Sequence, residues 1–340
     1  MPQPSKSPLC TTTILGTGSY VPEKVLTNAE LEVMVDTSDE WIFSRTGIRE
    51  RHIAAPDEPT SSLATKAARN ALKQAKVDPS ELDLIICATV TPDTFFPATA
   101  CYIQRNLQAN NAVCFDISAA CSGFLYAIQT ARHFINTGNR RTVLVLGAEK
   151  LSSIVNWEDR NTCVLFGDGA GAAVLRRRDD NGSENDLPTI LSSVMGCDGN
   201  LTDILVVQGG GSANPVTPEN VDQRLNTISM LGREVYKHAV TNMCRAAEKA
   251  IEEAGLQPSD IDRVIPHQAN VRIIDAITER LGLPRDRAFV NLTKYGNTSA
   301  ASIAIALDEA SRTGAIKRGD NILLVAFGAG LTWAATVIRW

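Results

Sequence analysis

The sequence contains a unit that occurs twice, 179 residues apart. The first copy, RNALKQAKVDPSELDLIICA, begins at Arg69, and the second, EKAIEEAGLQPSDIDRVIPH, begins at Glu248. Each copy has the pattern of an amphipathic helix, a turn at Pro-Ser followed by an acidic residue, and a buried strand. A chain that carries the same supersecondary unit twice is expected to fold into two similar halves.

Two further pairs of segments extend the repeat. The same spacing separates SAACSGFLYAIQTA, from Ser118, and NTSAASIAIALDEA, from Asn297, both of which lead from small residues into an apolar helix. A shorter spacing separates TCVLFGDGAGAAVL, from Thr162, and ILLVAFGAGLTWAATVI, from Ile322. Each of these last two segments predicts a hairpin of two strands joined by a Gly-rich turn. Three matches in one order indicate a duplication.

The strand candidates predict an α/β fold. They are almost continuous apolar runs, such as LDLIICATV, TVLVLGAE and NILLVAF, and they alternate with helical segments. This alternation predicts a central, largely parallel sheet that is covered on both faces. A chain of 340 residues is long enough for two such units. We therefore expect an N-terminal half over residues 1–175 and a C-terminal half over residues 176–340.

Composition excludes several classes of function. The formal net charge is −5, which argues against a general nucleic-acid binder. The chain has eight Cys and four His but neither a CxxC pair nor two His at i, i+4, so we expect no metal site. The cysteines lie mostly in apolar runs, as in a reduced cytoplasmic protein, and Cys10 is the first of them. We find no secretory signal and no apolar stretch long enough for a membrane span.

The two halves differ at the positions that could carry chemistry. At the spacing of the repeat, Cys121 is equivalent to Ala300, and His267 is equivalent to Ala88. Ligands of α/β proteins gather at the carboxyl ends of the strands. A site shared by the halves would therefore combine Cys121, His267 and the loop that contains Asn297.

Each of these three residues has a structural alternative. A strand is expected to end near Ile117 and a helix to begin near Cys121, which would lower the pKa of the thiol through the helix N-terminus. Cys121 could instead be a buried structural cysteine, His267 a core or capping histidine, and Asn297 a helix cap. The order Cys, His, Asn also occurs in papain-like thiol peptidases. Their Cys context is absent here, because the chain reads SAACSGF, and a duplicated α/β pattern does not suit that fold.

Several motifs together resemble the β-ketoacyl-[acyl-carrier-protein] synthase III family of the thiolase-like superfamily. The likeness runs from about Thr13 to the C-terminus and is carried by TSDEWIFSRTGIRERHI from Thr37, DISAACSGF from Asp116, FGDGAGAAVL from Phe166, PHQANVRI from Pro266, YGNTSAAS from Tyr295 and AFGAGLTW from Ala326. One departure is Ala329, where the family often has a third Gly. The resemblance implies a thiolase-like fold of two duplicated halves in α-β-α-β-α layers.

The resemblance also implies a reaction, the decarboxylative Claisen condensation that initiates fatty acid biosynthesis. Cys121 would take an acyl group from an acyl-CoA primer, in the first place acetyl-CoA. His267 and Asn297 would then receive malonyl on acyl carrier protein, and the products would be 3-oxoacyl-acyl carrier protein, CoA and CO2. The backbone N–H groups of Cys121 and Ala329 would form the oxyanion hole. No metal or redox cofactor is expected, because decarboxylation drives the formation of the carbon–carbon bond.

Further roles are implied for residues around this centre. The predicted CoA contacts are Thr37, Trp41, Arg45, Arg160 and Asn270, with the adenine held between Trp41 and Arg160. Phe96 would cap the acyl pocket, from a partner subunit if the protein is a homodimer. Acyl carrier protein is acidic, so we expect it to meet local basic residues. The predicted contacts are Gln268, Ala269, Asn270, Val271, Arg272, Arg233 and Lys237.

Three alternative functions remain open on the sequence. The first is a related condensing enzyme of secondary metabolism that uses another primer. The second is a thiol hydrolase with the same Cys, His and Asn. The third is a non-catalytic scaffold that binds carrier protein.

Overall fold

A computed structural model describes residues 11–178 and 187–340. Cys10 therefore lies outside the described residues. Within them the strands of the main sheet follow the order β11-β12-β13-β8-β1-β7-β6-β4-β5. Five of these strands come from the first half: β1 (Thr12–Tyr20), β4 (Leu84–Ala88), β5 (Val113–Ile117), β6 (Thr142–Glu149) and β7 (Gly169–Arg177). Four come from the second half: β8 (Thr189–Cys197), β11 (Arg263–Pro266), β12 (Asn321–Gly328) and β13 (Thr332–Arg339).

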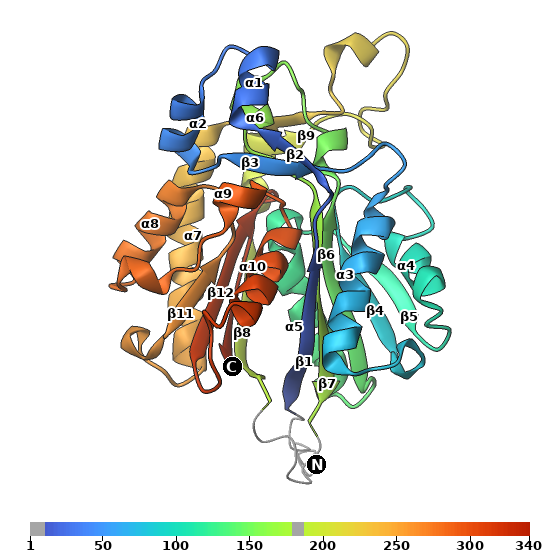
Figure 1. Ribbon diagram of the computed structural model, residues 1–340, viewed down its shortest axis with the longest axis vertical. Helices are drawn as coiled ribbons and strands as arrows, with labels where there is room; N and C mark the ends of the chain where they lie inside the picture. Colours follow the sequence, from blue (N-terminus) through green and yellow to red (C-terminus); the bar gives the residue numbers. More distant parts are fainter. Residues whose placement is uncertain (1–10, 179–186) are drawn as a thin grey trace.

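The two groups of strands meet at one point and diverge from it. The only residues paired between β1 and β8 in the described chain are Thr13 and Thr189, at the strand ends. Beyond them the groups separate, and helices fill the space between them (Figure 1). We propose that the structural halves divide close to the predicted boundary after residue 175, because β7 ends at Arg177 and β8 begins at Thr189.

Helices complete five layers. The central layer consists of α5 (Gly123–Asn136) and α10 (Ala301–Arg312). The outer layers consist of α3 (Thr60–Ala75) with α4 (Thr99–Leu107), and of α7 (Gly232–Glu253) with α8 (Val271–Arg280). Alternation along β12 shows the separation, since Ile322 and Leu324 belong to the central core while Leu323 and Val325 belong to the core beneath α7. The predicted layered α/β fold is confirmed.

The repeat predicted from the sequence is present in three dimensions. In the first half α3 is followed by a 3-10 turn at Pro79–Glu81 and by β4, and in the second half α7 is followed by a turn at Pro258–Asp260 and by β11. In both turns the side chain of the third residue accepts a hydrogen bond from the backbone N–H of the capping residue, Asp78 or Gln257. Equivalent sequences therefore form equivalent turns.

Two expectations about the strands were wrong. The sheet is mixed, because among the described strands only the pairs β11–β12, β4–β5 and β4–β6 are parallel. The Gly-rich segment of the second half forms the predicted hairpin, β12–β13, but that of the first half does not. There the residues of the expected first strand begin in a short helix, α6 (Arg160–Cys163), which Asp159 caps. The second strand, β7, pairs with β6 and β1 instead.

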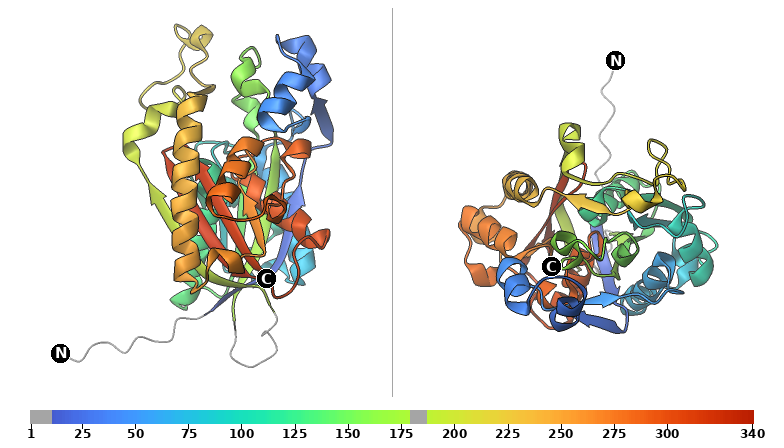
Figure 2. Two further views of the ribbon diagram at one scale, coloured as in Figure 1. Left: turned by 90° about the vertical axis from the view of Figure 1, so that its left-hand side faces the viewer. Right: turned by 90° about the horizontal axis from the view of Figure 1, so that it is seen from above.

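Smaller elements gather toward one end of the molecule, the upper end in Figure 1 and in the left view of Figure 2. They are β2 (Lys24–Thr27) paired with β3 (Glu50–Ile53), β9 (Leu205–Val207) paired with β10 (Ile228–Met230), α1 (Asn28–Met34), α2 (Asp39–Thr46) and α9 (Leu292–Tyr295). The C-terminal residue Trp340 is buried at the other end. No helix among the described residues is both long and apolar enough to cross a membrane.

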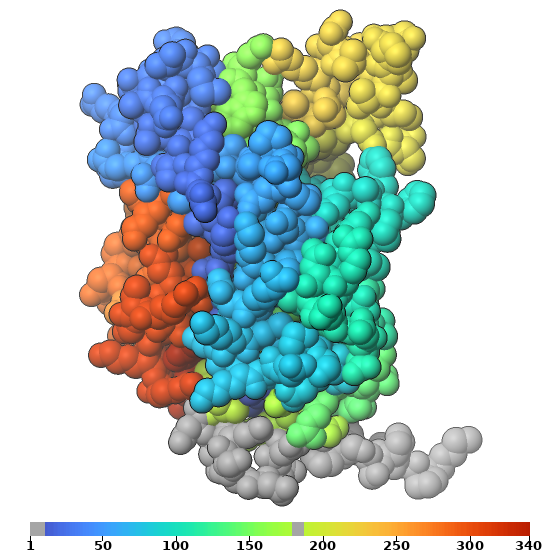
Figure 3. All heavy atoms as spheres, turned by 45° about the vertical axis from the view of Figure 1, so that its right-hand side comes forward, coloured from blue at the N-terminus to red at the C-terminus, as the bar shows by residue number. Residues whose placement is uncertain are grey.

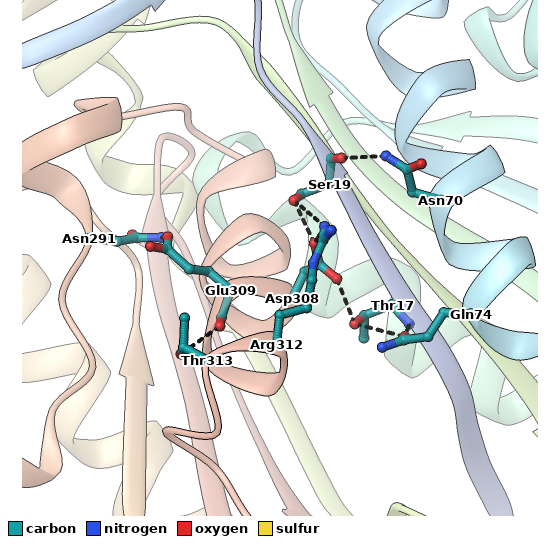
Figure 4. Close-up of polar contacts among 9 residues, drawn as sticks. All are labelled: Thr17, Ser19, Asn70, Gln74, Asn291, Asp308, Glu309, Arg312 and Thr313. Atoms are coloured by element: carbon teal, nitrogen blue, oxygen red, sulfur yellow. Dashed lines mark hydrogen bonds and ion pairs between the residues drawn. The ribbon is translucent and has the colours of Figure 1, made fainter.

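A buried carboxylate fixes α10 against the first half (Figure 4). Asp308 accepts hydrogen bonds from the hydroxyls of Thr17, at 2.9 Å, and Ser19, at 2.5 Å, and it pairs with Arg312 one turn further along α10. Thr17 in turn donates its backbone N–H to Gln74 of α3. A helix of the second half is thereby bonded to β1 and, through it, to an outer helix of the first half.

Gly18 allows α3 to lie directly on β1, and its replacement should destabilise the fold. A Cβ at this position would lie 2.2 Å from the backbone N of Ala71. We expect Gly18→Ala to lower the free energy of unfolding by about 3 kcal/mol, because two backbones must separate. The control is Gly199→Ala, where a Cβ meets nothing within 4 Å. Chemical denaturation of both variants checks this, and equal stabilities would contradict it.

Candidate active site

Cys121 lies at the junction between β5 and α5. It is the central residue of a 3-10 turn, Ala120–Ser122, that leads directly into α5, as the sequence predicted. Ala120 has a left-handed backbone with φ of 45°, an unfavourable conformation for a non-glycine residue. The end of β12 lies against this turn, since a Cβ on Gly328 would be 2.6 Å from the backbone N of Cys121. The turn is therefore held by both halves.

His267 follows β11 in the second half. Its backbone N–H donates to the carbonyl of Val325 on β12 at 2.8 Å, and its side chain is buried. The ring atom Nδ1 lies 2.6 Å from the hydroxyl Oγ of Ser302, in the first turn of α10. The ring is thus fixed by one helix while its other nitrogen, Nε2, stays available.

Asn297 is bound to the first half by its backbone. Its N–H donates to the carbonyl of Leu165 and its carbonyl accepts from the N–H of Gly167. Its side-chain oxygen Oδ1 accepts a hydrogen bond from the backbone N–H of Ser299 at 2.8 Å. Because the oxygen of the amide is used in this way, its NH2 group is the part left for a ligand.

One cavity brings the three residues together. Cys121, His267 and Asn297 all line a cavity of about 1390 Å³, although they come from distant parts of the chain. The segment of β9 and β10 forms part of its wall, because Leu205, Gln223 and Ile228 are also in its lining. The space-filling view shows residues of this segment, in yellow, projecting from the upper end of the molecule (Figure 3). This cavity is the candidate active site.

Burial keeps the thiol and the imidazole uncharged. It raises the pKa of Cys121 to about 12, an effect that Glu149 reinforces and a hydrogen bond with Ser299 opposes. The lowered pKa expected for a thiol at a helix start was wrong, because desolvation of the thiolate outweighs the helix terminus. Burial also lowers the pKa of His267 to about 3. The imidazole is therefore neutral at pH 7.

A buried carboxyl group close to this centre escaped the sequence analysis. Glu149, at the end of β6, accepts hydrogen bonds at Oε2 from the hydroxyls of Thr89 and Thr91 and from the backbone N–H of Val90. Burial raises its pKa to about 7, and a hydrogen bond with Ser299 opposes this shift. Glu149 lies in none of the motifs, and Ser299 lies in the YGNTSAAS segment but had no predicted role. Among the described residues no cluster of three or more His, Cys, Asp or Glu could hold a metal ion.

Comparison with known proteins decides the family. Models of 3-oxoacyl-[acyl-carrier-protein] synthase III match residues 115–199 and, for its C-terminal part, residues 251–340. The chain is 58% identical over 327 residues to a β-ketoacyl-[acyl-carrier-protein] synthase III of Caldanaerobacter subterraneus subsp. tengcongensis. The aligned residues make up 96% of this chain and 97% of that one. The chain belongs to the β-ketoacyl-[acyl-carrier-protein] synthase III family. It is an acyltransferase, a condensing enzyme of fatty acid biosynthesis.

Solved structures of family members have the same fold. The synthase III of Aquifex aeolicus superposes with a TM-score of 0.88 at 51% identity, over 97% of this chain and 100% of that one. The synthase III of Thermus thermophilus gives 0.88 at 47% identity, over 96% of this chain and 99% of that one. These matches confirm the thiolase-like fold and exclude the papain-like alternative.

The predicted CoA contacts lie at the mouth of the cavity or beside it. Trp41, Arg45 and Asn270 line the cavity, whereas Thr37 and Arg160 are not among the lining residues. The guanidinium of Arg160 lies 5.0 Å from the centre of the Trp41 ring, and Arg160 also donates to the carbonyl of Asp36. An adenine between them needs about 7 Å, twice the ordinary contact distance. Arg160 must therefore move before the predicted sandwich can form.

The predicted carrier-protein contacts include one that is wrong. Gln268 is 1% exposed, and its amide bonds to the backbones of Pro266, Phe289, Asn291 and Leu292. This side chain joins the strand end to the loop before α9 and cannot touch a protein partner. Of the other predicted contacts, Ala269, Asn270, Arg272 and Arg233 line the cavity, whereas Val271 and Lys237 do not. The basic side chains Arg233, Lys237 and Arg272 are exposed.

Phe96 and Ala329, for which roles in the acyl pocket and the oxyanion hole were predicted, are both absent from the lining of the cavity. Phe96 is 86% exposed and is absent from the lining, so within a single chain it caps no acyl pocket. Ala329 is not among the residues with positive φ, and the third Gly of the family motif is therefore dispensable here for backbone conformation. The role of its N–H in an oxyanion hole stays a prediction.

The contact between Gly328 and Cys121 should be essential for activity. A methyl group on Gly328 would push the Cys121 turn away from β12. We expect Gly328→Ala to reduce transferase activity by at least about 100-fold, the loss typical of a disturbed oxyanion hole. Ala329→Gly is the control and should keep activity within about threefold. Steady-state assays of both variants test this, and an active Gly328→Ala would contradict it.

The raised pKa of Cys121 predicts a steep pH dependence of its alkylation. Since the thiol titrates at about 12, the reactive thiolate is a minor species at pH 7, and its fraction grows about tenfold for each pH unit. We expect the rate of carbamidomethylation by iodoacetamide to rise in this way from pH 7 to pH 10. Mass spectrometry of the Cys121 peptide measures it, and exposed Cys197 reports reagent activity. A plateau below pH 9 would contradict this, because it would show that the helix N-terminus lowers the pKa of Cys121 by more than burial raises it.

Proposed function

We propose that this chain condenses an acyl-CoA primer, acetyl-CoA in the first place, with malonyl-acyl carrier protein. The observation that carries the proposal is one buried thiol sharing a cavity with a neutral imidazole and a free carboxamide NH2. In the first step the sulfur of Cys121 attacks the thioester carbonyl of the primer. The acyl group passes to Cys121, and CoA leaves as the thiol.

Decarboxylation of malonyl then requires hydrogen-bond donors that do not lose their protons. Loss of CO2 turns the malonyl thioester into an enolate, whose oxygen carries the developing negative charge. His267 with its lowered pKa and Asn297 with its free NH2 are uncharged donors at the buried end of the cavity. A dry surrounding strengthens both hydrogen bonds in the transition state.

The enolate carbon attacks the acyl-Cys121 carbonyl to form the new carbon–carbon bond. Cys121 leaves as a thiolate and takes up a proton from water, because its own proton departed with CoA in the first step, and 3-oxoacyl-acyl carrier protein departs. The N–H groups of Cys121 and Ala329 would stabilise the tetrahedral oxyanion, a role that the packing of Gly328 on Cys121 supports. The carboxylate lost as CO2 supplies the driving force, so the scheme requires neither a metal nor a redox group.

Partner recognition is part of the proposal. The acidic carrier protein would dock at the mouth of the cavity, where Arg45, Arg233 and Arg272 are in the lining. We also propose a homodimer through β5, which is an edge strand with half-exposed side chains beside the exposed Phe95 and Phe96. In such a dimer Phe96 could reach the partner's cavity. A cytoplasmic location stays a prediction.

The choice of primer depends on the deep part of the cavity. Its lining there includes Ala239, Met243 and Phe327, three buried apolar side chains. A scan of acyl-CoA primers of increasing length and branching against malonyl-acyl carrier protein measures the preference. A preference for primers other than acetyl-CoA would favour the alternative function in secondary metabolism.

The two half-reactions separate the proposed roles. Incubation with acetyl-CoA should leave an acetyl group on Cys121, seen by mass spectrometry, and Cys121→Ala should stay unmodified. We expect His267→Ala to keep this acetylation but to lose at least about 100-fold in release of CO2 from malonyl-acyl carrier protein, because one enolate donor is gone. Loss of acetylation with intact decarboxylation would reverse the assignment. Thioester hydrolysis with no condensation would favour the thiol hydrolase instead.

A further inference from the structure

Ser302 is a buried residue that touches His267 but belongs to none of the predicted site residues. It lies in the first turn of α10 and is 2% exposed. Its hydroxyl Oγ lies 2.6 Å from Nδ1 of His267 and accepts a long hydrogen bond, 3.5 Å, from the backbone N–H of Gln268. These are the side-chain hydrogen bonds of Ser302 within the described residues. The contact to His267 is therefore the dominant one.

The number of available protons determines which partner donates in the short hydrogen bond between Ser302 and His267. A serine hydroxyl has one proton to donate, and a neutral imidazole has one N–H and one acceptor nitrogen. If Nδ1 carried the proton, the hydroxyl would receive two N–H groups and its own proton would have no acceptor among the described residues. A buried donor without an acceptor destabilises the arrangement that contains it. If Nδ1 is the acceptor, the hydroxyl proton and the Gln268 N–H are both used, and the proton on Nε2 belongs to a residue that lines the cavity, where solvent or a ligand can accept it.

We propose that Ser302 is a positioning residue that fixes His267 in the tautomer with the proton on Nε2. This proposal deepens the proposed function, on which its catalytic meaning rests. An imidazole with the proton on Nε2 presents an N–H to the cavity, and this is the form that can donate to the enolate oxygen. The other tautomer would present a lone pair to the same oxygen and repel it.

The surroundings of Ser302 keep its hydroxyl in place. α10 cannot shift easily along its axis, because Asp308, two turns further on, is bonded to Thr17 and Ser19 of β1 (Figure 4). At the other end of the contact, the backbone of His267 is bonded to β12. Burial lowers the pKa of the imidazole, so no second proton competes for Nδ1 in the neutral pH range.

The tautomer can be measured directly, without substrate. Nitrogen-15 NMR of histidine-labelled protein distinguishes a protonated ring nitrogen from an unprotonated one, and a spectrum of His267→Ala assigns the signals. We expect wild-type His267 to show an unprotonated Nδ1 and a protonated Nε2 from pH 6 to pH 8. A proton on Nδ1 would overturn the proposal. This readout holds even if the proposed reaction is wrong.

Kinetics of Ser302→Ala then test the consequence. Loss of the hydroxyl should lower decarboxylation of malonyl-acyl carrier protein by about 10-fold to 100-fold, the range equivalent to the cost of the unmatched donor. Acetylation of Cys121 should change by less than about twofold, and the NMR signals of Nδ1 and Nε2 should become mixed. The control is Ser311→Ala, the same change further along α10, with the wild-type rate expected. Equal loss of both half-reactions, or no loss in decarboxylation, would overturn the proposal.

Discussion

Direct contact between backbones holds the active site together. Where α10 begins, a Cβ on Gly147 would lie 2.2 Å from the carbonyl oxygen of Ala300, and one on Gly171 would lie 2.4 Å from Cβ of Ala304. At the other side of the site a Cβ on Gly328 would lie 2.6 Å from the backbone N of Cys121. Such distances exclude any larger side chain. Elements from both halves are thereby fixed against each other to within a fraction of a side-chain diameter, and the reacting groups need that precision.

The chemistry of the site follows from its dryness. A thiol and an imidazole that are both almost fully buried remain neutral, so neither of these two groups places a charge next to the reacting carbons. Neutral donors suit an enolate, because they stabilise negative charge without protonating it. The cationic side chains stay at the mouth, where Arg45 and Arg272 can meet anionic groups of a substrate. The separation of a charged entrance from an uncharged interior follows from the depth of the cavity.

The duplicated pattern was sufficient to predict the strand–turn–helix position of Cys121 and the meeting of Cys121, His267 and Asn297 in one cavity. The division into two halves stays a proposal. The pattern could not predict that Gln268 is buried, because a short sequence motif does not distinguish an amide on the surface from one that bonds four backbone groups. Nor could it predict the pKa of Cys121, which depends on the desolvation that tertiary packing creates. The role of Ser302, the last residue of the YGNTSAAS segment, could not be predicted for a similar reason, because its partner His267 lies 35 positions away in the sequence.

The position of the last strand has a consequence for synthesis of the chain. β13 is an interior strand that joins β12 to β8, and β12 supplies the glycine that packs on the Cys121 turn. A ribosome makes β12 and β13 only after it has made Cys121. A nascent chain that already contains the nucleophile therefore lacks the surface that shields it, and a truncated product would carry an unguarded sulfur. The Cys121 turn is therefore covered only once β12 and β13 have been made and have joined the sheet.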